Sequence, residues 1–145
     1  MPASTERTAI IAATPEKVMS VVTDFESYPS WQKEVQDALV HARDEQDRPI
    51  KVTITTVAMG MTVNALLDVT YGENTMDYTL AQVTDMTIQQ DAHYVLTPQP
   101  DGTTELTLTM AVDLKWNVPE FMLKQLISKG VNDNIKAVKR VAEAG

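Results

Sequence analysis

Apolar and polar residues alternate along most of the chain between residues 35 and 116. A period of two sends one set of side chains to a buried face and the other to a solvent face, so each run predicts a β-strand. The cleanest run has its apolar positions at Leu106, Leu108, Met110, Val112 and Leu114. Residues 4–12 form another run at the start of the chain, for which we expect an edge strand.

Polar segments rich in Gly, Pro, Asp and Asn separate these runs at residues 44–49, 71–74 and 98–102. These residue types favour tight turns, and short turns join antiparallel strands. The pattern therefore predicts an antiparallel meander of six strands together with the N-terminal strand.

A change to a period of about 3.6 residues marks the helices. Thr14 is a favourable N-cap residue, and Pro15 is favourable in the first turn of a helix. Near Pro29 we expect a second short helix or turn that carries Trp31 back over the core. The first apolar stripe consists of Val18, Met19, Val21, Val22 and Phe25.

Pro119 begins a long amphipathic helix that we expect to reach about Glu143. Gly130 interrupts its apolar stripe and costs about 1 kcal/mol in a helix interior, so a kink or a close approach is expected there. The stripe consists of Met122, Leu126, Ile127, Val131, Ile135, Val138 and Val141.

A curved antiparallel sheet with one apolar face needs a cover, and the C-terminal helix is the element long enough to supply it. The predicted class is α+β. We expect one domain over residues 1–145, with a curved seven-stranded antiparallel sheet wrapped around the long C-terminal helix and two short helices between strands 1 and 2.

Antiparallel strands send alternate turns to opposite ends of a sheet, so counting assigns each turn to an end. The three polar turns share one end. The segment with Trp31 and residues 59–61, 83–86 and 116–118, all with apolar side chains, share the other. Apolar turns mark an interface or the mouth of a cavity; the alternative is that these side chains fold back and plug the end of the core.

The inner face of the sheet carries few polar groups, as expected of a pocket for a small molecule. Strand alternation places both Ile88 and Gln90 on the inner face, unless a bulge resets the register. The expected cavity residues are Thr56, Leu67, Tyr78, Gln90, Tyr94, Met110, Met122 and Leu126, and the expected mouth residues are Trp31, Met59, Met61 and Met86.

Charge and composition exclude several functions. The chain has 145 residues, 12 Lys and Arg against 20 Asp and Glu, a net charge of −8, two His and no Cys. The excess of negative charge disfavours nucleic acid, and the lack of thiols with only two His disfavours a metal site. We expect no cofactor, no integral membrane insertion, no signal peptide and a cytoplasmic protein.

Candidate catalytic groups are few. His93 falls on the outer parity, and His41 is the histidine left as a base, without an apparent carboxylate partner. The motifs of serine hydrolases, phosphate loops, zinc proteases and dinucleotide-binding folds are all missing from the sequence.

The segment AATPEKVMSVVTDFESYPSW, residues 12–31, resembles the opening of the START-like SRPBCC superfamily, the group of polyketide cyclases/dehydrases and birch-pollen allergens. The matching residues are Thr14, Pro15, Glu16, Val18, Asp24, Phe25, Tyr28, Pro29 and Trp31. The chain is most similar to the small actinobacterial cyclase/dehydrase branch and more distantly to the coenzyme Q-binding START branch. The resemblance implies a helix-grip fold with a hydrophobic cavity that opens near residues 59–61 and 83–86.

The sequence leaves two functions from different classes open, and the apolar turns leave a third role open. The first is binding or transport of a hydrophobic or amphipathic small molecule such as a lipid, quinone or polyketide, helped by adaptable Met side chains. The alternative is a cyclase or dehydratase that moves protons with Tyr78, Tyr94 or His41; the arginines of this chain match no pocket arginine of the cyclases. The apolar rim leaves a weak homodimer or another docking role open.

Overall fold

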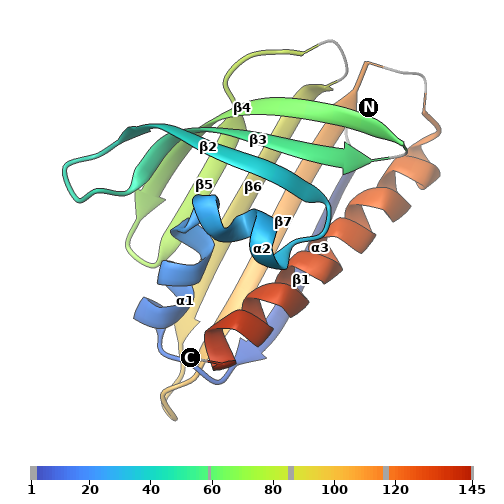
Figure 1. Ribbon diagram of the computed structural model, residues 1–145. Coiled ribbons are helices and arrows are strands. Elements are labelled where there is room, and N and C mark those ends of the chain that lie inside the picture. Colours follow the sequence, from blue (N-terminus) through green and yellow to red (C-terminus); the bar gives the residue numbers. More distant parts are fainter. Residues whose placement is uncertain (1–2, 59, 85–86, 116–117, 145) are drawn as a thin grey trace.

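The computed structural model describes residues 3–58, 60–84, 87–115 and 118–144. Within them, one antiparallel sheet has the strand order β1-β7-β6-β5-β4-β3-β2. Its strands are β1 (Ala3–Ile11), β2 (Val35–Arg43), β3 (Pro49–Ala58), β4 (Met61–Gly72), β5 (Thr75–Leu80), β6 (Thr87–Pro98) and β7 (Thr104–Leu114). The meander from β2 to β7, with β1 added at the edge beside β7, confirms the predicted topology (Figure 1).

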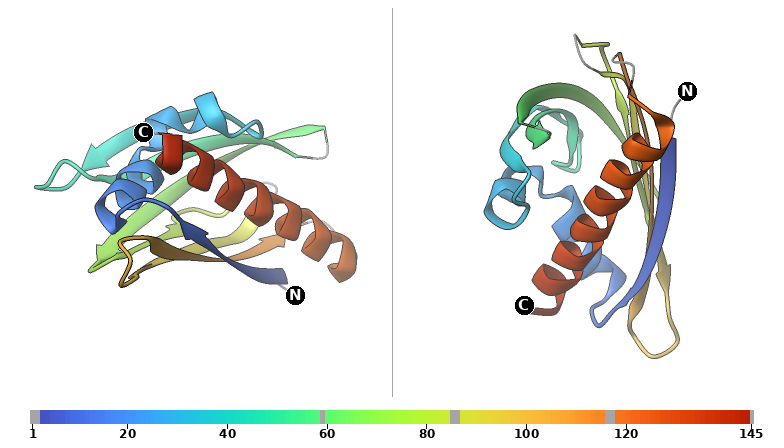
Figure 2. Two further views of the ribbon diagram at one scale, coloured as in Figure 1. Left: turned by 90° about the horizontal axis from the view of Figure 1, so that it is seen from below. Right: turned by 90° about the vertical axis from the view of Figure 1, so that its right-hand side faces the viewer.

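The helices lie on the concave side of the curved sheet (Figure 2). Between β1 and β2 the chain forms α1 (Pro15–Thr23), the short 3-10 helix η1 (Phe25–Ser27) and α2 (Tyr28–Trp31), and α3 (Glu120–Ala144) follows β7. The start of α1 is as predicted, because the Thr14 hydroxyl accepts a hydrogen bond from the Lys17 backbone N–H at 3.2 Å. This arrangement is the helix grip expected from the sequence.

One half of the concave face is filled by the helices. Phe25 is fully buried, with its ring centroid 4.9 Å from that of Tyr28 and 6.5 Å from that of Tyr78 on β5. The Tyr28 hydroxyl donates to the Val22 carbonyl at the end of α1. The strand halves next to the polar turns therefore form a packed core with α1, η1 and α2.

The C-terminal half of α3 is fastened to the end of β1. The Lys139 ammonium donates to the Ile10 carbonyl at 2.6 Å, and the Glu143 carboxylate accepts from the Ala12 N–H at 2.8 Å. The side chains of α3 that are buried against the core share one broad face of the helix. They are Leu123, Ile127, Val131, Asn134, Ile135, Ala137, Val138 and Ala142. The N-terminal half of α3 continues past the packed core toward the apolar turns.

A register shift between Thr87 and Gln89 interrupts the pairing of β6 with β7. It leaves Thr87 only 2% exposed and turns Ile88 outward, with 42% of its surface exposed. The prediction that Ile88 faces inward is therefore wrong, because the irregularity resets the alternation. The irregularity lies before Gln90, and Gln90 still faces inward.

In the described part of the chain, no helix combines the length and apolar character needed to cross a lipid bilayer.

Gly130 in α3 gives a test of the helix. The predicted close approach is absent, because a Cβ built there meets no atom within 4 Å. We expect Gly130→Ala to raise the free energy of unfolding by roughly 0.5–1 kcal/mol through helix propensity, as measured by urea denaturation.

Gly102 is the matched control, since a Cβ there also has open space but the backbone φ is +87°. Gly102→Ala should lower the free energy of unfolding, because an L side chain is strained in the left-handed region. A destabilising Gly130→Ala would contradict the open space at the helix.

Candidate functional site

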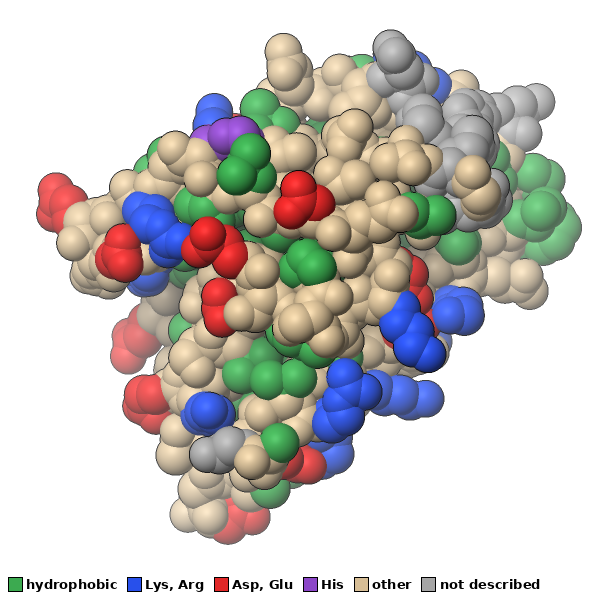
Figure 3. All heavy atoms as spheres, viewed as in Figure 1, with side chains coloured by type: hydrophobic (Ala, Val, Ile, Leu, Met, Phe, Trp, Pro, Cys, Tyr) green, Lys and Arg blue, Asp and Glu red, His purple; other side chains and the backbone are tan. Residues whose placement is uncertain are grey.

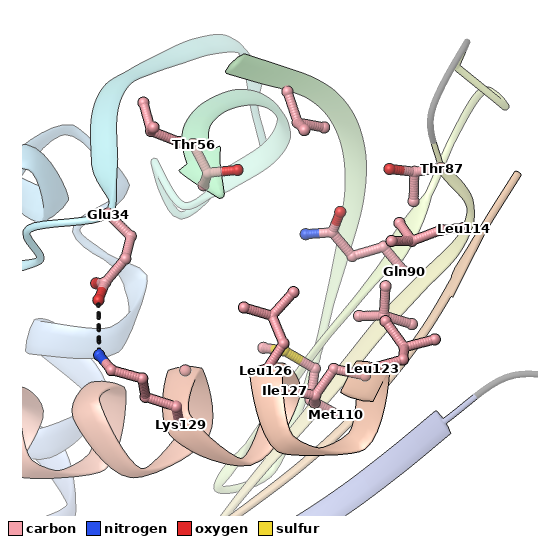
Figure 4. A pocket seen from close by; sticks show the side chains of 14 residues that line it. Glu34, Thr56, Thr87, Gln90, Met110, Leu114, Leu123, Leu126, Ile127 and Lys129 are labelled. Carbon is pink, nitrogen blue, oxygen red and sulfur yellow. Dashed lines mark ion pairs between the residues drawn. The ribbon is translucent and has the colours of Figure 1, made fainter. Parts of the chain in front are cut away.

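A cavity of about 390 Å³ lies between the sheet and the N-terminal half of α3. Its walls come from β3, β4, β6, β7 and α3, near the end of the sheet with the apolar turns (Figure 4). The lining residues are Glu34, Thr56, Val57, Val63, Thr87, Gln90, Met110, Val112, Leu114, Leu123, Leu126, Ile127, Lys129 and Gly130. The volume lies at the small end of the range for small-molecule sites, and the lining is mainly apolar.

Neutral polar groups reach the cavity from the sheet. The amide of Gln90 and the hydroxyl of Thr87 point into it from β6, and the Thr56 hydroxyl faces it from β3 (Figure 4). An amide can donate and accept, so Gln90 can hold a ligand hydroxyl or carbonyl.

A charged pair closes another side of the cavity. The Lys129 ammonium on α3 lies 3.9 Å from the Glu34 carboxylate, which comes from the segment before β2 (Figure 4). The same ammonium lies 2.8 Å from the Asp133 carboxylate one helical turn on. The hydrogen bond with Asp133 raises the pKa of Lys129, and it lowers the pKa of Asp133. Lys129 therefore stays cationic, and its contact with Glu34 is the looser of the two.

The tyrosines of the inner face are buried behind the cavity. Burial raises the pKa of Tyr78 to about 12, an effect that a hydrogen bond with Gln90 partly offsets. The Tyr94 hydroxyl donates to Asn134 Oδ1 at 3.4 Å, and Asn134 Nδ2 donates to Gln32 Oε1 at 3.1 Å. Tyr78 thus touches the site through Gln90, whereas Tyr94 belongs to a network under α2.

Four of the predicted cavity residues line the cavity: Thr56, Gln90, Met110 and Leu126. Leu67, Tyr78 and Tyr94 also face inward, but they are buried in the core and do not line the cavity. The physical reason is that α1, η1 and α2 fill the part of the concave face next to the polar turns. Met59 and Met86 lie outside the described residues, and of Met61 the structure describes the backbone alone.

Two predicted positions are corrected. Met122 is 48% exposed and Leu123 lines the cavity in its place, because α3 turns its Leu123–Ile127–Val131 row toward the core. Trp31, which was expected at the mouth, lines the hollow beside the cavity and not the cavity itself. It packs against Tyr28 at the end of α2, with ring centroids 5.0 Å apart, and the following residues carry Glu34 to the cavity wall instead.

Sequence reasoning missed several lining residues: Glu34, Val57, Val63, Thr87, Val112, Leu114, Leu123, Ile127, Lys129 and Gly130. Val112 and Leu114 share the parity of Met110, and Ile127 shares the face of Leu126, so the signal was available for these. The position of Thr87 depended on the β6 irregularity, and that of Lys129 depended on how closely α3 approaches the segment before β2.

The histidines lie away from the cavity. His41 Nε2 is 2.7 Å from the Thr53 hydroxyl and His93 pairs with Asp77, and both side chains are exposed. Across the described ranges, no three His, Asp or Glu side chains gather in a way that could hold a metal ion.

The sequence matches the protein family described as polyketide cyclase / dehydrase and lipid transport over residues 2–143. The chain belongs to this family. A START superfamily protein from Mycobacterium smegmatis is 27% identical, with a TM-score of 0.89 over 97% of both chains. These matches confirm the expected START/SRPBCC membership. No curated protein sequence matches significantly.

More distant structures share the fold alone. Zhui aromatase/cyclase from Streptomyces sp. R1128 is 13% identical, with a TM-score of 0.80 over 99% of this chain and 94% of the other. Ara h 8.0201 is 15% identical, with a TM-score of 0.73 over 100% of both chains.

Burial of the tyrosines predicts that the folded protein loses stability at alkaline pH. Burial raises the pKa of Tyr71 and Tyr78 from 10.0 to about 12, and it raises the pKa of Tyr28 and Tyr94 well above 10.0. Because each folded pKa exceeds the unfolded value, this stabilisation is complete below about pH 10 and is lost as the pH rises toward the folded pKa values. We expect the free energy of unfolding to fall above about pH 10, as measured by urea denaturation at a series of pH values.

The ultraviolet absorbance of tyrosinate supplies the direct readout. It should stay low in the folded protein at pH 10.0, the ordinary tyrosine pKa, and rise on unfolding at that pH. Four tyrosines that titrate normally in the folded protein would contradict their burial.

Proposed function

We propose that this chain binds or transports a hydrophobic or amphipathic small molecule, of the lipid, quinone or polyketide class, in the cavity between the sheet and α3. The supporting observation is a mainly apolar cavity of about 390 Å³ that Thr56, Thr87 and Gln90 reach with neutral polar groups. The family description, which names polyketide chemistry and lipid transport, agrees with this class of ligand.

Burial of the apolar part of the ligand supplies most of the affinity, at about 25 cal/mol per Å² before the costs of ordering. Gln90 orients a neutral oxygen of the ligand, since its amide offers both a donor and an acceptor. The Gln90 amide also lies near the buried Tyr78 phenol, whose pKa it lowers against the effect of burial. The site thus favours a molecule with an apolar body and a polar group directed at β6.

The alternative is a cyclase or dehydratase, an activity of the kind named for the structurally similar Zhui aromatase/cyclase. Of its candidate residues, Tyr78 contacts the cavity through Gln90, and its raised pKa keeps the phenol neutral at neutral pH. A neutral phenol can donate a proton or a hydrogen bond but is a poor base. Binding is the better supported of the two functions.

Two further points concern the location of the protein and its partners. We infer that it works in the cytoplasm. We also infer that it does not bind nucleic acid, since the net charge is −8. A weak homodimer through the apolar end of the sheet is the competing role. Val83, in the segment after β5, and Phe121, in the first turn of α3, are 57% and 67% exposed.

The role of Gln90 can be tested with dodecanol and the neutral fluorescent dye N-phenylnaphthylamine. We expect Gln90→Leu to weaken dodecanol binding by roughly three- to tenfold, because one hydrogen bond to the hydroxyl is lost. Dye binding should change by less than about twofold, since the apolar lining is kept. Competition between dodecanol and the dye gives both affinities.

Gln89→Leu is the matched control. Gln89 is the next residue on β6, and its amide donates to the Asp91 carboxylate at 2.7 Å instead of lining the cavity. Equal effects of the two substitutions on dodecanol would contradict a contact between Gln90 and the ligand. Loss of folding in Gln90→Leu alone would assign Gln90 a structural role.

The cavity itself is tested by filling it. Gly130 lines the cavity with open space beside it, so a larger side chain there takes up ligand volume. We expect Gly130→Leu to lower dye affinity at least about tenfold, through lost volume and lost apolar contact, while the protein stays folded by circular dichroism.

Gly130→Ala is the control for Gly130→Leu and should keep most of the binding. Full dye binding by Gly130→Leu would contradict the cavity as the site. A wild-type protein that takes up no dye but forms a dimer that Phe121→Asp dissociates would favour the docking role.

A further inference from the structure

A second hollow, of about 320 Å³, lies beside the cavity between the segment after α2 and the middle of α3. It is lined by Trp31, Gln32, Lys33, Glu34, Lys129, Asp133, Lys136, Ala137 and Arg140, and we refer to it as the basic recess. Glu34 and Lys129 line both the recess and the cavity. Their ion pair, drawn in Figure 4, is therefore the partition between the two hollows.

The basic recess carries an excess of positive charge in a chain whose net charge is −8. Its charged lining consists of the cations Lys33, Lys129, Lys136 and Arg140 and the anions Glu34 and Asp133. Figure 3 shows Lys and Arg side chains gathered over the course of α3, away from the acidic side chains of the β2–β3 hairpin. A local basic site against an acidic background favours small anions over bulk cations.

Three of these cations form no close ion pair within the described part of the chain. Lys33 and Lys136 form no ion pair with any residue that the structure describes. The Arg140 guanidinium donates to a backbone carbonyl, that of Trp31, at 3.4 Å. An anion can therefore enter the basic recess and pair with these three side chains without first displacing a close ion-pair partner.

Among the described residues, one buried side-chain nitrogen has no hydrogen-bond partner. It is Nε2 of Gln32. Its Oε1 already accepts from Asn134, so the amide orientation is set. A buried donor without an acceptor is destabilising. Gln32 lines the recess, and a shift that brought its Nε2 to the recess surface would let an anion oxygen supply the missing acceptor.

We propose that the basic recess binds the anionic head of an amphipathic ligand, a carboxylate or a phosphate monoester, while the apolar part of the same molecule occupies the cavity. This inference rests on the proposed function. The head competes with Glu34 for Lys129, whose contact with Glu34 is 3.9 Å long, and Lys129 keeps its closer contact with Asp133 at 2.8 Å. Displacement of Glu34 joins the two hollows at their shared wall.

Dodecanoate, dodecyl phosphate and dodecanol test the inference, because they share an apolar chain and differ in the charge of the head. At neutral pH and low salt, the wild-type protein should bind each anion roughly tenfold more tightly than dodecanol, as charge-assisted hydrogen bonds are stronger than neutral ones. Added salt should reduce this preference, because the recess is open to solvent. Displacement of N-phenylnaphthylamine measures all three ligands.

The double variant Lys33→Gln/Lys136→Gln should bring the anions to within about twofold of dodecanol and leave dodecanol affinity unchanged. Lys124→Gln is the matched control: Lys124 is on the same helix and is exposed, but it lines neither hollow. It should keep the preference for the anions. A preference for one anion over the other identifies which head the recess fits.

The outcomes separate the two proposals. If dodecanol binds but the anions bind no better, or if the double variant and Lys124→Gln reduce the preference equally, the basic recess has no such role and the cavity proposal stands. If none of the three ligands nor the dye binds, the proposed function fails, and this inference fails with it.

Discussion

The structure depends on how one apolar face of a curved sheet is covered. The helices leave part of the inner face of the seven-stranded sheet unpacked, and that part lines the cavity. Phe25 and Tyr28 fill the half next to the polar turns, and the C-terminal half of α3 is tied to β1 through Lys139 and Glu143. The N-terminal half of α3 then spans the remaining inner face without filling it. The cavity is the part of the apolar face that the helices enclose but do not pack against.

This division explains why side chains of the same parity have different environments. Tyr94 and Met110 both face inward, but Tyr94 lies where η1 and α2 complete the core and Met110 lies beyond them. A polar group in the first region needs a protein partner, and Tyr94 has Asn134. Gln90 in the second region has Tyr78 and can also meet a ligand. The inner face thus changes from structure to binding site along the length of the strands.

Charge follows the same geometry. The walls contributed by the sheet are apolar or neutral, and the charged groups enter where α3 approaches the segment before β2, at Glu34 and Lys129. A neutral wall and a charged rim suit a molecule with an apolar body. Adaptable Met side chains contribute less than their abundance suggested, since Met110 lines the cavity, Met76 is fully buried in the core and Met122 faces solvent.

Local rules that act within a few residues determined the class of the fold from the sequence alone. The N-cap at Thr14, the alternation around Met110 and the polar turns predicted the helices, the meander and the end of the sheet where the cavity lies. The exposure of Met122, the inward turn of Thr87 and the pairing of Glu34 with Lys129 were decided by tertiary structure. Helix phase, a register shift and the approach of two distant segments depend on packing between elements, which periodicity along one element does not contain.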